Sequence, residues 1–318
     1  MALIINLIMQ GIQMMLVLLV APLLVGVVRK VRARILLRRG PSIVQPYRDL
    51  WRLLRKESIV AHNASWLFRV APYLVFSAVW VAAALVPVFA TGLEFNWTAD
   101  LLAIVALLGT ARFATALAAM DIGTSFGGLG ASREMMVASL AEPAMLMIVF
   151  TISLLAGTTQ LSEIANFVAS QPIGLRISLA FAFVALIIVA VAENARIPVD
   201  NPSTHLELTM IHEAMVLEYS GRHLALIEAA SATKLLLYMS LVISLFLPFG
   251  IATNAAPLSL QVVGMLIWLV KLGIGAVLLA IGETVVSKMR LFRVAEFLGA
   301  ALVMGLLSMI FLFVFKGI

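Results

Sequence analysis

Long apolar stretches run through the whole chain, and they limit its fold more than any other feature. Each of about eight such stretches is long enough to cross a hydrocarbon core of about 30 Å as a helix. Because lipid offers no hydrogen-bonding partner, a spanning segment has to pair its backbone groups internally, as a helix does. The predicted spans are residues 3–28, 66–91, 99–120, 134–156, 175–195, 224–250, 258–282 and 293–316. We therefore expect an all-α integral membrane protein, with residues 1–318 forming a single transmembrane domain.

The composition agrees with a lipid environment and excludes several kinds of cofactor site. Hydrophobic residues make up 63% of the chain and charged residues 12%, whereas about a quarter of a soluble domain is charged. The absence of cysteine excludes disulfides, thiolate zinc sites and cysteine-held iron–sulfur clusters within this chain. The histidines lie outside the predicted spans, so we do not expect a haem held between two transmembrane histidines. They are His62, His205, His212 and His223.

The distribution of lysine and arginine predicts how the chain lies in the membrane. Residues 29–56 contain 10 of the 22 basic residues, and the positive-inside rule places such a segment in the cytoplasm. We therefore expect a basic cytoplasmic segment over 29–65, an acidic cytoplasmic loop over 196–223, and both termini outside, in a multi-pass protein of the cell's inner (cytoplasmic) membrane. Residues 1–28 lack the basic region and cleavage site of a signal peptide, so we interpret them as a retained first helix. Because this topology explains the net charge of +6, we expect no nucleic-acid partner.

A short amphipathic helix is predicted inside the basic segment. Pro46 suits its first turn, where the missing N–H would have had no partner within the helix. The apolar residues at helical spacing are Tyr47, Leu50, Trp51 and Leu54, and the basic residues of the other face are Arg48, Arg52, Arg55 and Lys56. Such a helix lies either in the headgroup layer as a membrane anchor or against a partner subunit, and the pattern alone favours neither.

Several ionisable residues lie within or at the ends of the predicted spans, where each costs several kcal/mol unless it is paired or hydrated. They are Arg112, Glu134, Glu142, Glu193, Glu228, Lys234, Lys271 and Glu283. Glu142 precedes Pro143, which removes one backbone hydrogen bond and can open the helix to water beside the carboxylate. These groups are candidates for an ion or proton path. The alternative is structural pairing between helices, of Glu228 or Glu283 with Lys234 or Lys271.

The densest polar cluster follows the fifth span, over residues 193–221. Asp200 or Asn201 can cap a helix that begins near Pro202, and Gly221 can end it. We therefore expect one helix across most of this loop, lying at the membrane surface.

The predicted loop helix would place Glu207 and Glu218 on one face, because they are 11 residues or about three turns apart. His205 and His212 would share another face. Carboxylates in a row at a membrane surface can pass protons through water. Two other interpretations stay open: a metal bound by the histidines with Glu207 or Glu213, and a solvated loop helix without such a role.

A glycine-rich stretch over residues 121–133 lies between the third and fourth predicted spans. It follows no strand, so the pattern does not favour a nucleotide-binding loop. We expect a loop whose glycines allow close packing against a neighbouring subunit.

Three groups of motifs resemble the complex I subunit 1 family. The first is Arg38-Arg39-Gly40-Pro41 with Gln45, Asp49 and Lys56-Glu57. The second contains Glu193, Arg196, Pro198, Asp200, Pro202, Glu207-Leu208 and Glu218-Tyr219-Ser220-Gly221. The third, Asp121 to Glu134 followed by Ala141-Glu142-Pro143, resembles the membrane-anchor subunit of group 4 nickel-iron hydrogenases, of the formate hydrogenlyase subunit 4 type. The resemblance covers nearly the whole chain. It departs at Ser203-Thr204-His205, where many relatives are acidic, and at His212-Glu213.

This resemblance implies a subunit of a hydrogenase or complex I-like respiratory complex. Such a subunit anchors a peripheral redox arm and couples electron transfer to proton or sodium translocation. The implied partners are a hydrogenase-like large subunit, an iron–sulfur small subunit, antiporter-like membrane subunits and the lipid bilayer. The nickel-iron centre and the iron–sulfur clusters belong to the partners, so this chain would hold no metal, no cofactor and no catalytic residue.

The resemblance and the placement of charge together give two sets of candidate residues. The proton path or coupling set is Glu134, Glu142, Glu193, Asp200, Glu207, Glu213, Glu218, Glu228, Lys234 and Lys271. The set expected to dock the peripheral arm is Arg34, Arg38, Arg39, Arg48, Asp49, Arg52 and Arg196. Two other functions stay open: the equivalent subunit of a quinone-reducing enzyme, and a free-standing ion-coupled secondary transporter. The lack of an evident internal repeat disfavours the transporter.

Overall fold

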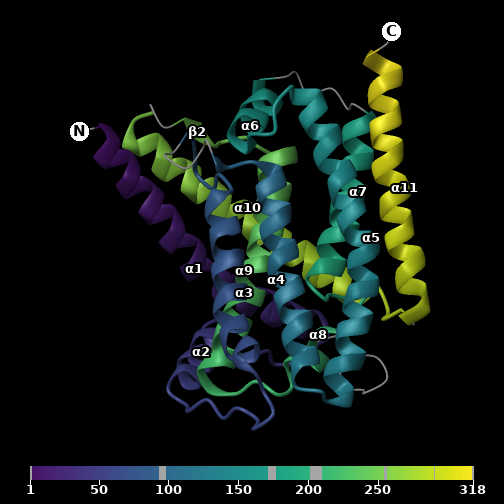
Figure 1. The fold of residues 1–318 in the computed structure, drawn as a ribbon. Coiled ribbons are helices and arrows are strands. Elements are labelled where there is room, and N and C mark those ends of the chain that lie inside the picture. The colour runs from purple at the N-terminus through teal and green to yellow at the C-terminus, as the bar shows by residue number, and fades with distance from the viewer. Residues whose placement is uncertain are drawn as a thin grey trace.

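The computed structural model describes residues 2–92, 98–170, 177–200, 210–253, 256–289 and 291–316. Within these ranges the chain is almost entirely helical (Figure 1). The helices are α1 (Ala2–Ile35), α2 (Gln45–Leu54), α3 (Trp66–Leu85), α4 (Leu101–Asp121), α5 (Ser125–Ala156), α6 (Leu161–Ser170), α7 (Ile177–Glu193), α8 (His212–Val216), α9 (Gly221–Phe246), α10 (Leu258–Val285) and α11 (Leu291–Lys316). The strands of the described ranges are β1 (Ala90–Thr91) and β2 (Ala252–Thr253), which pair in parallel.

Seven helices are long and apolar enough to cross a membrane, namely α1, α3, α4, α5, α9, α10 and α11. The remaining predicted span corresponds to α7, an apolar helix whose described part begins at Ile177 and is 17 residues long. The chain is therefore an all-α, multi-pass membrane protein. Seven of the predicted spans coincide with helices of spanning length.

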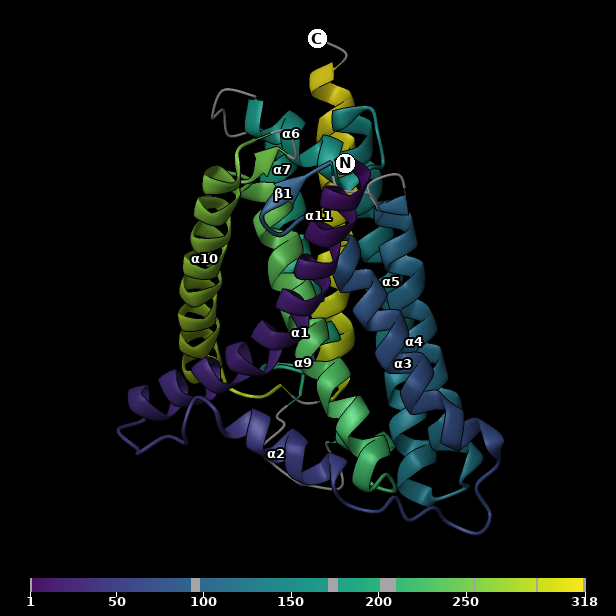
Figure 2. The ribbon, with the colours of Figure 1, turned by 90° about the vertical axis from the view of Figure 1, so that its left-hand side faces the viewer.

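The helices pack side by side, and their connections gather at two ends of the bundle. Figures 1 and 2 show α2, α8 and the turn between α4 and α5 at one end, with α6, the strand pair and both termini at the other. Helix α1 crosses the bundle obliquely and packs against α10 and α9, while α11 runs along α5 and α7. Large side chains without solvent exposure fill the middle of the bundle, including Ile104 of α4, Ile148 of α5, Leu186 of α7 and Leu236 of α9.

Helix α2 confirms the short helix that was predicted inside the basic segment. Pro46 lies in its first turn and is buried. The hydroxyl of Tyr47 donates to the carbonyl oxygen of Leu19 in α1, and α2 also packs against α9. Trp51 and Leu54 remain exposed, with 60% and 45% of their surfaces accessible. The apolar face of α2 is therefore shared between packing on the bundle and an open surface.

The glycine-rich stretch is not the loop that we predicted, because α5 begins inside it. The side chain of Thr124 accepts a hydrogen bond from the N–H of Gly127 at 3.2 Å and starts the helix. A Cβ on Gly127 would lie 2.3 Å from the carbonyl oxygen of Ala119 in α4, and a Cβ on Gly130 would lie 3.0 Å from the side chain of Met215 in α8. These glycines allow close packing, but against other parts of this chain.

The predicted helix from near Pro202 to Gly221 is contradicted over the described part of the loop. Helix α8 has only five residues, and Gly221 begins α9 instead of ending a helix. Residues 201–209 lie outside the described residues, and they include His205 and Glu207. Glu218 lies beyond the end of α8, so the structure gives no support to a helix face shared with Glu207.

Gly221 shows why the helix prediction was wrong at this end of the loop. Its φ is +53°, a left-handed conformation that strains a residue with a side chain. A Cβ there would lie 2.4 Å from the carbonyl oxygen of Glu57 in the basic segment. The hydroxyl of Ser220 joins the same contact, since it accepts from the N–H of Ile59 at 2.9 Å and donates to the Ile59 carbonyl at 2.9 Å. The glycine therefore allows two loops to meet where a helix end was expected.

Candidate functional site

A buried arginine collects three carboxylates inside the helix bundle. The side chain of Arg112 is only 5% exposed, and its Nε lies 3.5 Å from Oε1 of Glu134. Its Nη1 donates to Oε1 of Glu142 at 3.1 Å, and its Nη2 is paired with Glu193. Nζ of Lys234 lies 2.9 Å from Oε2 of Glu193. We call these five residues the Arg112 cluster.

Four helices of the bundle, α4, α5, α7 and α9, supply the Arg112 cluster. Arg112 comes from the middle of α4 and Lys234 from the middle of α9, while Glu193 is the last residue of α7. Glu134 and Glu142 both belong to α5, and their spacing of about two turns places them on one side of that helix. Charged groups from separate parts of the sequence therefore meet because their helices pack together.

The Arg112 cluster holds more acidic than basic groups. Three carboxylates face two cations, which leaves one excess negative charge when all five groups are ionised. An uncompensated charge is costly where the dielectric constant is low. Because the uptake of one proton or one monovalent cation would make the group neutral, its composition suits reversible binding of either.

The carboxylates of the Arg112 cluster differ in exposure. The Glu193 side chain is 3% exposed and that of Glu134 is 14% exposed, whereas Glu142 is 46% exposed in this single chain. The cluster therefore extends from the interior of the bundle to the lateral surface of α5. A half-exposed carboxylate in a spanning helix needs water or another protein chain beside it.

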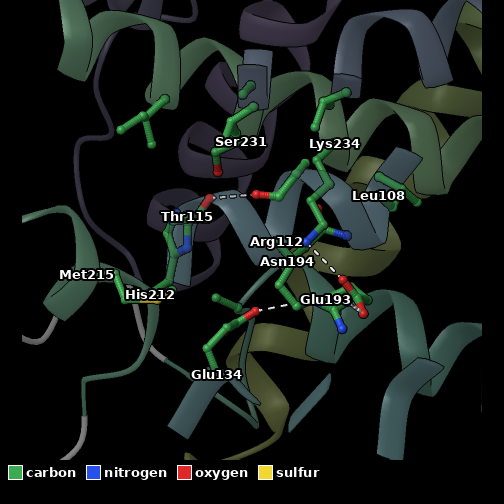
Figure 3. A pocket seen from close by; sticks show the side chains of 16 residues that line it. Leu108, Arg112, Thr115, Glu134, Glu193, Asn194, His212, Met215, Ser231 and Lys234 are labelled. Carbon is green, nitrogen blue, oxygen red and sulfur yellow. Dashed lines mark hydrogen bonds and ion pairs between the residues drawn. The ribbon is translucent and has the colours of Figure 1, made fainter. Parts of the chain in front are cut away.

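A cavity of about 50 Å³ adjoins the Arg112 cluster, which is room for a few water molecules. Glu134, Glu193 and Lys234 line it together with Arg112, and His212 of α8 adds an imidazole to its wall. Figure 3 shows His212 and Thr115 on one side of Arg112, with Glu193 and Lys234 on the other. The polar lining and the size allow water to join these groups.

Two more ion-paired groups lie near the end of the bundle that carries α2 and α8. Glu283 of α10 is paired with Arg196 at 3.2 Å and with Arg32 of α1 at 3.4 Å. Burial lowers the pKa of the Arg196 guanidinium, and the Glu283 carboxylate opposes that shift. Nζ of Lys288 donates to Asp200 at 3.0 Å.

The chain from 193 to 200 contributes one charged side chain to each of these three groups. Glu193 belongs to the Arg112 cluster, Arg196 holds Glu283, and Asp200 holds Lys288. Oδ2 of Asp200 also accepts from the N–H of Ile211 at 3.2 Å, which ties the start of the loop to the approach to α8. This segment therefore connects the interior charges with α1, α10 and the loop.

The pairing that we considered as an alternative occurs, but with other partners. Glu283 is paired with arginines, and Lys234 is paired with Glu193. Lys271 donates instead to the carbonyl oxygens of Leu247 and Phe249 beyond the end of α9. Charge type alone predicted that pairs would form, whereas the choice of partner depends on how the helices pack.

The structure brings only part of the predicted proton-path set together. Glu134, Glu142, Glu193 and Lys234 meet at Arg112, and Asp200 lies in a neighbouring ion pair. Glu213 is half-buried on α8, and both Glu218 and Glu228 are exposed. Lys271 caps α9 away from the cluster, and Glu207 is outside the described residues. The metal hypothesis involved His205 and Glu207, which are also outside them; within the described residues no group of three or more candidate ligands gathers.

The predicted docking residues fall into two groups. Arg34, Arg38, Arg39, Arg48 and Arg52 are exposed. Asp49 accepts from Gln45 at 3.1 Å and is paired with Arg52 at 3.3 Å. Arg196 differs, since its side chain is only 13% exposed and is held by Glu283. Arg112 and Glu283 were noted as charges in spans, but their central roles in pairing have no local sequence signal.

A bundle of spanning helices joined by interior ion pairs is the class of protein that this structure defines. The family model described as NADH dehydrogenase matches residues 8–314, and the chain belongs to this family. It is 32% identical to formate hydrogenlyase subunit 4 of Escherichia coli (strain K12) over 86% of this chain and 87% of the relative. Hydrogenase-4 component C of the same organism is also 32% identical, over 87% of each chain.

More distant similarity extends to the quinone-linked branch of the family. An NADH-quinone oxidoreductase subunit of Rickettsia africae (strain ESF-5) is 29% identical over 70% of this chain and 69% of the relative. Among solved structures, a chain of the archaeal membrane-bound sulfane sulfur reductase has a TM-score of 0.80. It is 20% identical, and the match covers 98% of this chain and 100% of that one, which shows a common fold.

Proposed function

We propose that this chain is the membrane subunit of a hydrogenase-type respiratory complex, which anchors a peripheral redox arm and couples electron transfer to proton or sodium translocation. The observation that carries the coupling role is the Arg112 cluster, because its one excess negative charge lies beside a cavity that can hold water. The similarity to formate hydrogenlyase subunit 4 supports a hydrogenase complex over a quinone-reducing one.

The proposed proton path uses Glu134, Glu142, Glu193 and Lys234 within the Arg112 cluster. Its lateral exit is Glu142, since this carboxylate is the most exposed of the three and faces out from α5. An antiporter-like membrane subunit that covers this surface would receive the charge. Asp200, Glu213, Glu218 and Glu228 stay in the proposal as groups near the loop end, and Glu207 stays in it on the sequence alone. Lys271 is better explained as a helix cap.

The proposed docking surface is the exposed basic part of the α1–α2 segment. Arg34, Arg38, Arg39, Arg48 and Arg52 are free to meet carboxylates of the peripheral subunits. We place this end of the bundle in the cytoplasm and both termini outside, in the inner membrane, because 10 of the 22 basic residues lie in 29–56. About eight spans, with α7 included, agree with two termini on one side.

We place the redox cofactors in the partner subunits. The chain has no cysteine to hold an iron–sulfur cluster. A nickel-iron centre in a hydrogenase-like large subunit and clusters in a small subunit would therefore carry the electrons, while this chain moves charge without changing oxidation state.

Purification of the chain from its own membranes, through an affinity tag, tests the proposal. The expected result is a complex that contains nickel and iron, evolves or consumes hydrogen, and builds an ion gradient in vesicles during turnover. The isolated chain in vesicles should transport nothing. Ion transport by the chain without partners would identify a free-standing transporter and overturn the proposal.

A further inference from the structure

We infer that His212 is the proton-entry group of the Arg112 cluster, passing protons from the loop end of the bundle through cavity water to Glu134 or Glu193. This inference rests on the proposed function and deepens it, because it assigns a role to a residue outside the acidic set. The motivation is a shared cavity wall: His212 lines the same space of about 50 Å³ as the four most buried members of the cluster.

The position of His212 suits entry from the loop end. It is the first residue of α8, which packs against α5 and α4 at the end of the bundle that also carries α2 (Figure 1). Its surface is partly exposed, while the Glu134 and Glu193 side chains are 14% and 3% exposed. Figure 3 shows the imidazole reaching toward the cavity from the side opposite Glu193. His212 therefore lies between the loop and carboxylates that have little contact with solvent of their own.

Two polar residues that line this cavity beside His212, Arg112 and Thr115, are less suited than the imidazole to relay a proton. The Arg112 guanidinium is held by three carboxylates, which it orients. Thr115 donates to the carbonyl oxygen of Ala111 at 2.9 Å, which engages its proton in the helix. Histidine titrates between pH 5 and 8 in most environments and can bind a proton at either ring nitrogen. Lys234 also carries exchangeable protons, but it lies in the middle of α9 and is paired with Glu193, whereas His212 begins α8 at the loop end of the bundle.

The charges around His212 come from every helix packed near it. They are Arg112 from α4, Glu134 and Arg133 from α5, Glu193 from α7, Lys234 and Glu228 from α9, and Glu213 from α8 itself; the Arg133 guanidinium donates to the carbonyl oxygen of Met210 just before α8. Acidic and basic side chains therefore both lie on the elements that adjoin His212.

The transfer balances without any further reactant. A proton binds to the free nitrogen of the neutral ring from the loop side, and the proton on the other nitrogen leaves to cavity water. That water releases a proton to a carboxylate oxygen of Glu134 or Glu193. The ring returns to the neutral form with its proton on the opposite nitrogen, and rotation or proton exchange restores the first tautomer.

The test compares His212→Gln with His62→Gln in the intact complex. His62 is an exposed histidine of the loop before α3, at the same end of the bundle, and does not line the cavity. Both variants should assemble and reduce protons with an artificial electron donor. We expect His212→Gln to lower the ions moved per turnover at least fivefold, and His62→Gln to leave them unchanged. His212→Glu should restore part of the coupling with a pH optimum shifted to lower pH, because a carboxylate titrates below an imidazole.

Normal coupling in His212→Gln would overturn the inference, as would assembled His212→Glu that is no better coupled than His212→Gln. Failure of both His212→Gln and His212→Glu to assemble would also count against the inference, since it would indicate that His212 has a packing role. Glu142→Gln, measured alongside, separates this inference from the proposed function. If Glu142→Gln is uncoupled while His212→Gln is coupled, only the entry role is wrong; if both are fully coupled, the proposed function fails as well.

Discussion

Lys234 and Glu193 form an ion pair at 2.9 Å, while the other oxygen of the same carboxylate is paired with Arg112. One glutamate at the end of α7 thus binds cations of both α4 and α9. The same residue begins the segment 193–200, whose other charges hold Glu283 and Lys288. A change of charge at Glu193 is therefore expected to alter the ion pairs inside the bundle and the position of the loop that follows α7.

Glu193→Gln should weaken the complex as well as its coupling. The substitution leaves Lys234 without its carboxylate and removes one of the three partners of Arg112. Loss of one partner from a buried ion pair costs about 3–5 kcal/mol; here Lys234 loses the carboxylate that it contacts directly, although the cluster as a whole becomes neutral. We expect a lower thermal midpoint and a reduced yield of assembled complex. Glu163→Gln, on α6 at the other end of the bundle, is the control; equal stability of the two variants would contradict the structural role of Glu193.

Gly221→Ala should destabilise the junction between the loop and the basic segment. The residue has φ +53°, and its Cβ would lie 2.4 Å from the carbonyl oxygen of Glu57. Strain of this kind costs roughly 1–3 kcal/mol, to which the backbone clash adds. Gly128→Ala is a matched control, because Gly128 is helical in α5 and a Cβ there meets nothing within 4 Å. A thermal midpoint of Gly221→Ala at or above that of Gly128→Ala would show that the junction tolerates a side chain.

The apolar runs made the fold class predictable from the sequence. The sequence did not reveal which charged residues pair with one another. Hydrophobic length identifies a spanning helix from local sequence alone, so α3, α4, α9, α10 and α11 were found near their observed positions. The start of α5 was missed, because its glycines were interpreted as a loop although they lie where α5 meets α4 and α8. The meeting of Arg112 with Glu193 depends on the tertiary packing of α4 and α7 against α5, which local sequence does not reveal.

The exposed arginines of the basic segment should hold the peripheral arm. Arg38, Arg39, Arg48 and Arg52 are all exposed, and single exposed ion pairs contribute little, so all four are replaced together by alanine. We expect the soluble subunits to leave the membrane during a wash at moderate salt. Arg222→Ala, an exposed arginine at the start of α9, is the control. If the quadruple variant purifies with its full peripheral arm, these arginines contact only lipid and do not hold the arm.

The orientation can be tested in a chain that has no native cysteine. Arg34→Cys, in the last turn of α1, should react with an impermeant thiol reagent only after the cytoplasmic face is made accessible. A cysteine at Asp100, at the start of α4 and the other end of the bundle, should react from the outside. Reaction of Arg34→Cys in intact cells would reverse the proposed topology.

The measurement that tests coupling most directly is the number of ions moved per hydrogen formed in Glu142→Gln. Glutamine matches this carboxylate in shape and can still accept a hydrogen bond from Arg112, and the side chain is 46% exposed, so the complex should assemble. Glu57→Gln, an exposed carboxylate of the basic segment, controls for loss of charge. In sealed vesicles we expect Glu142→Gln to keep hydrogenase activity with an artificial donor while its ion gradient per turnover falls at least fivefold. A normally assembled Glu142→Gln complex with the same gradient per turnover as Glu57→Gln would contradict the account.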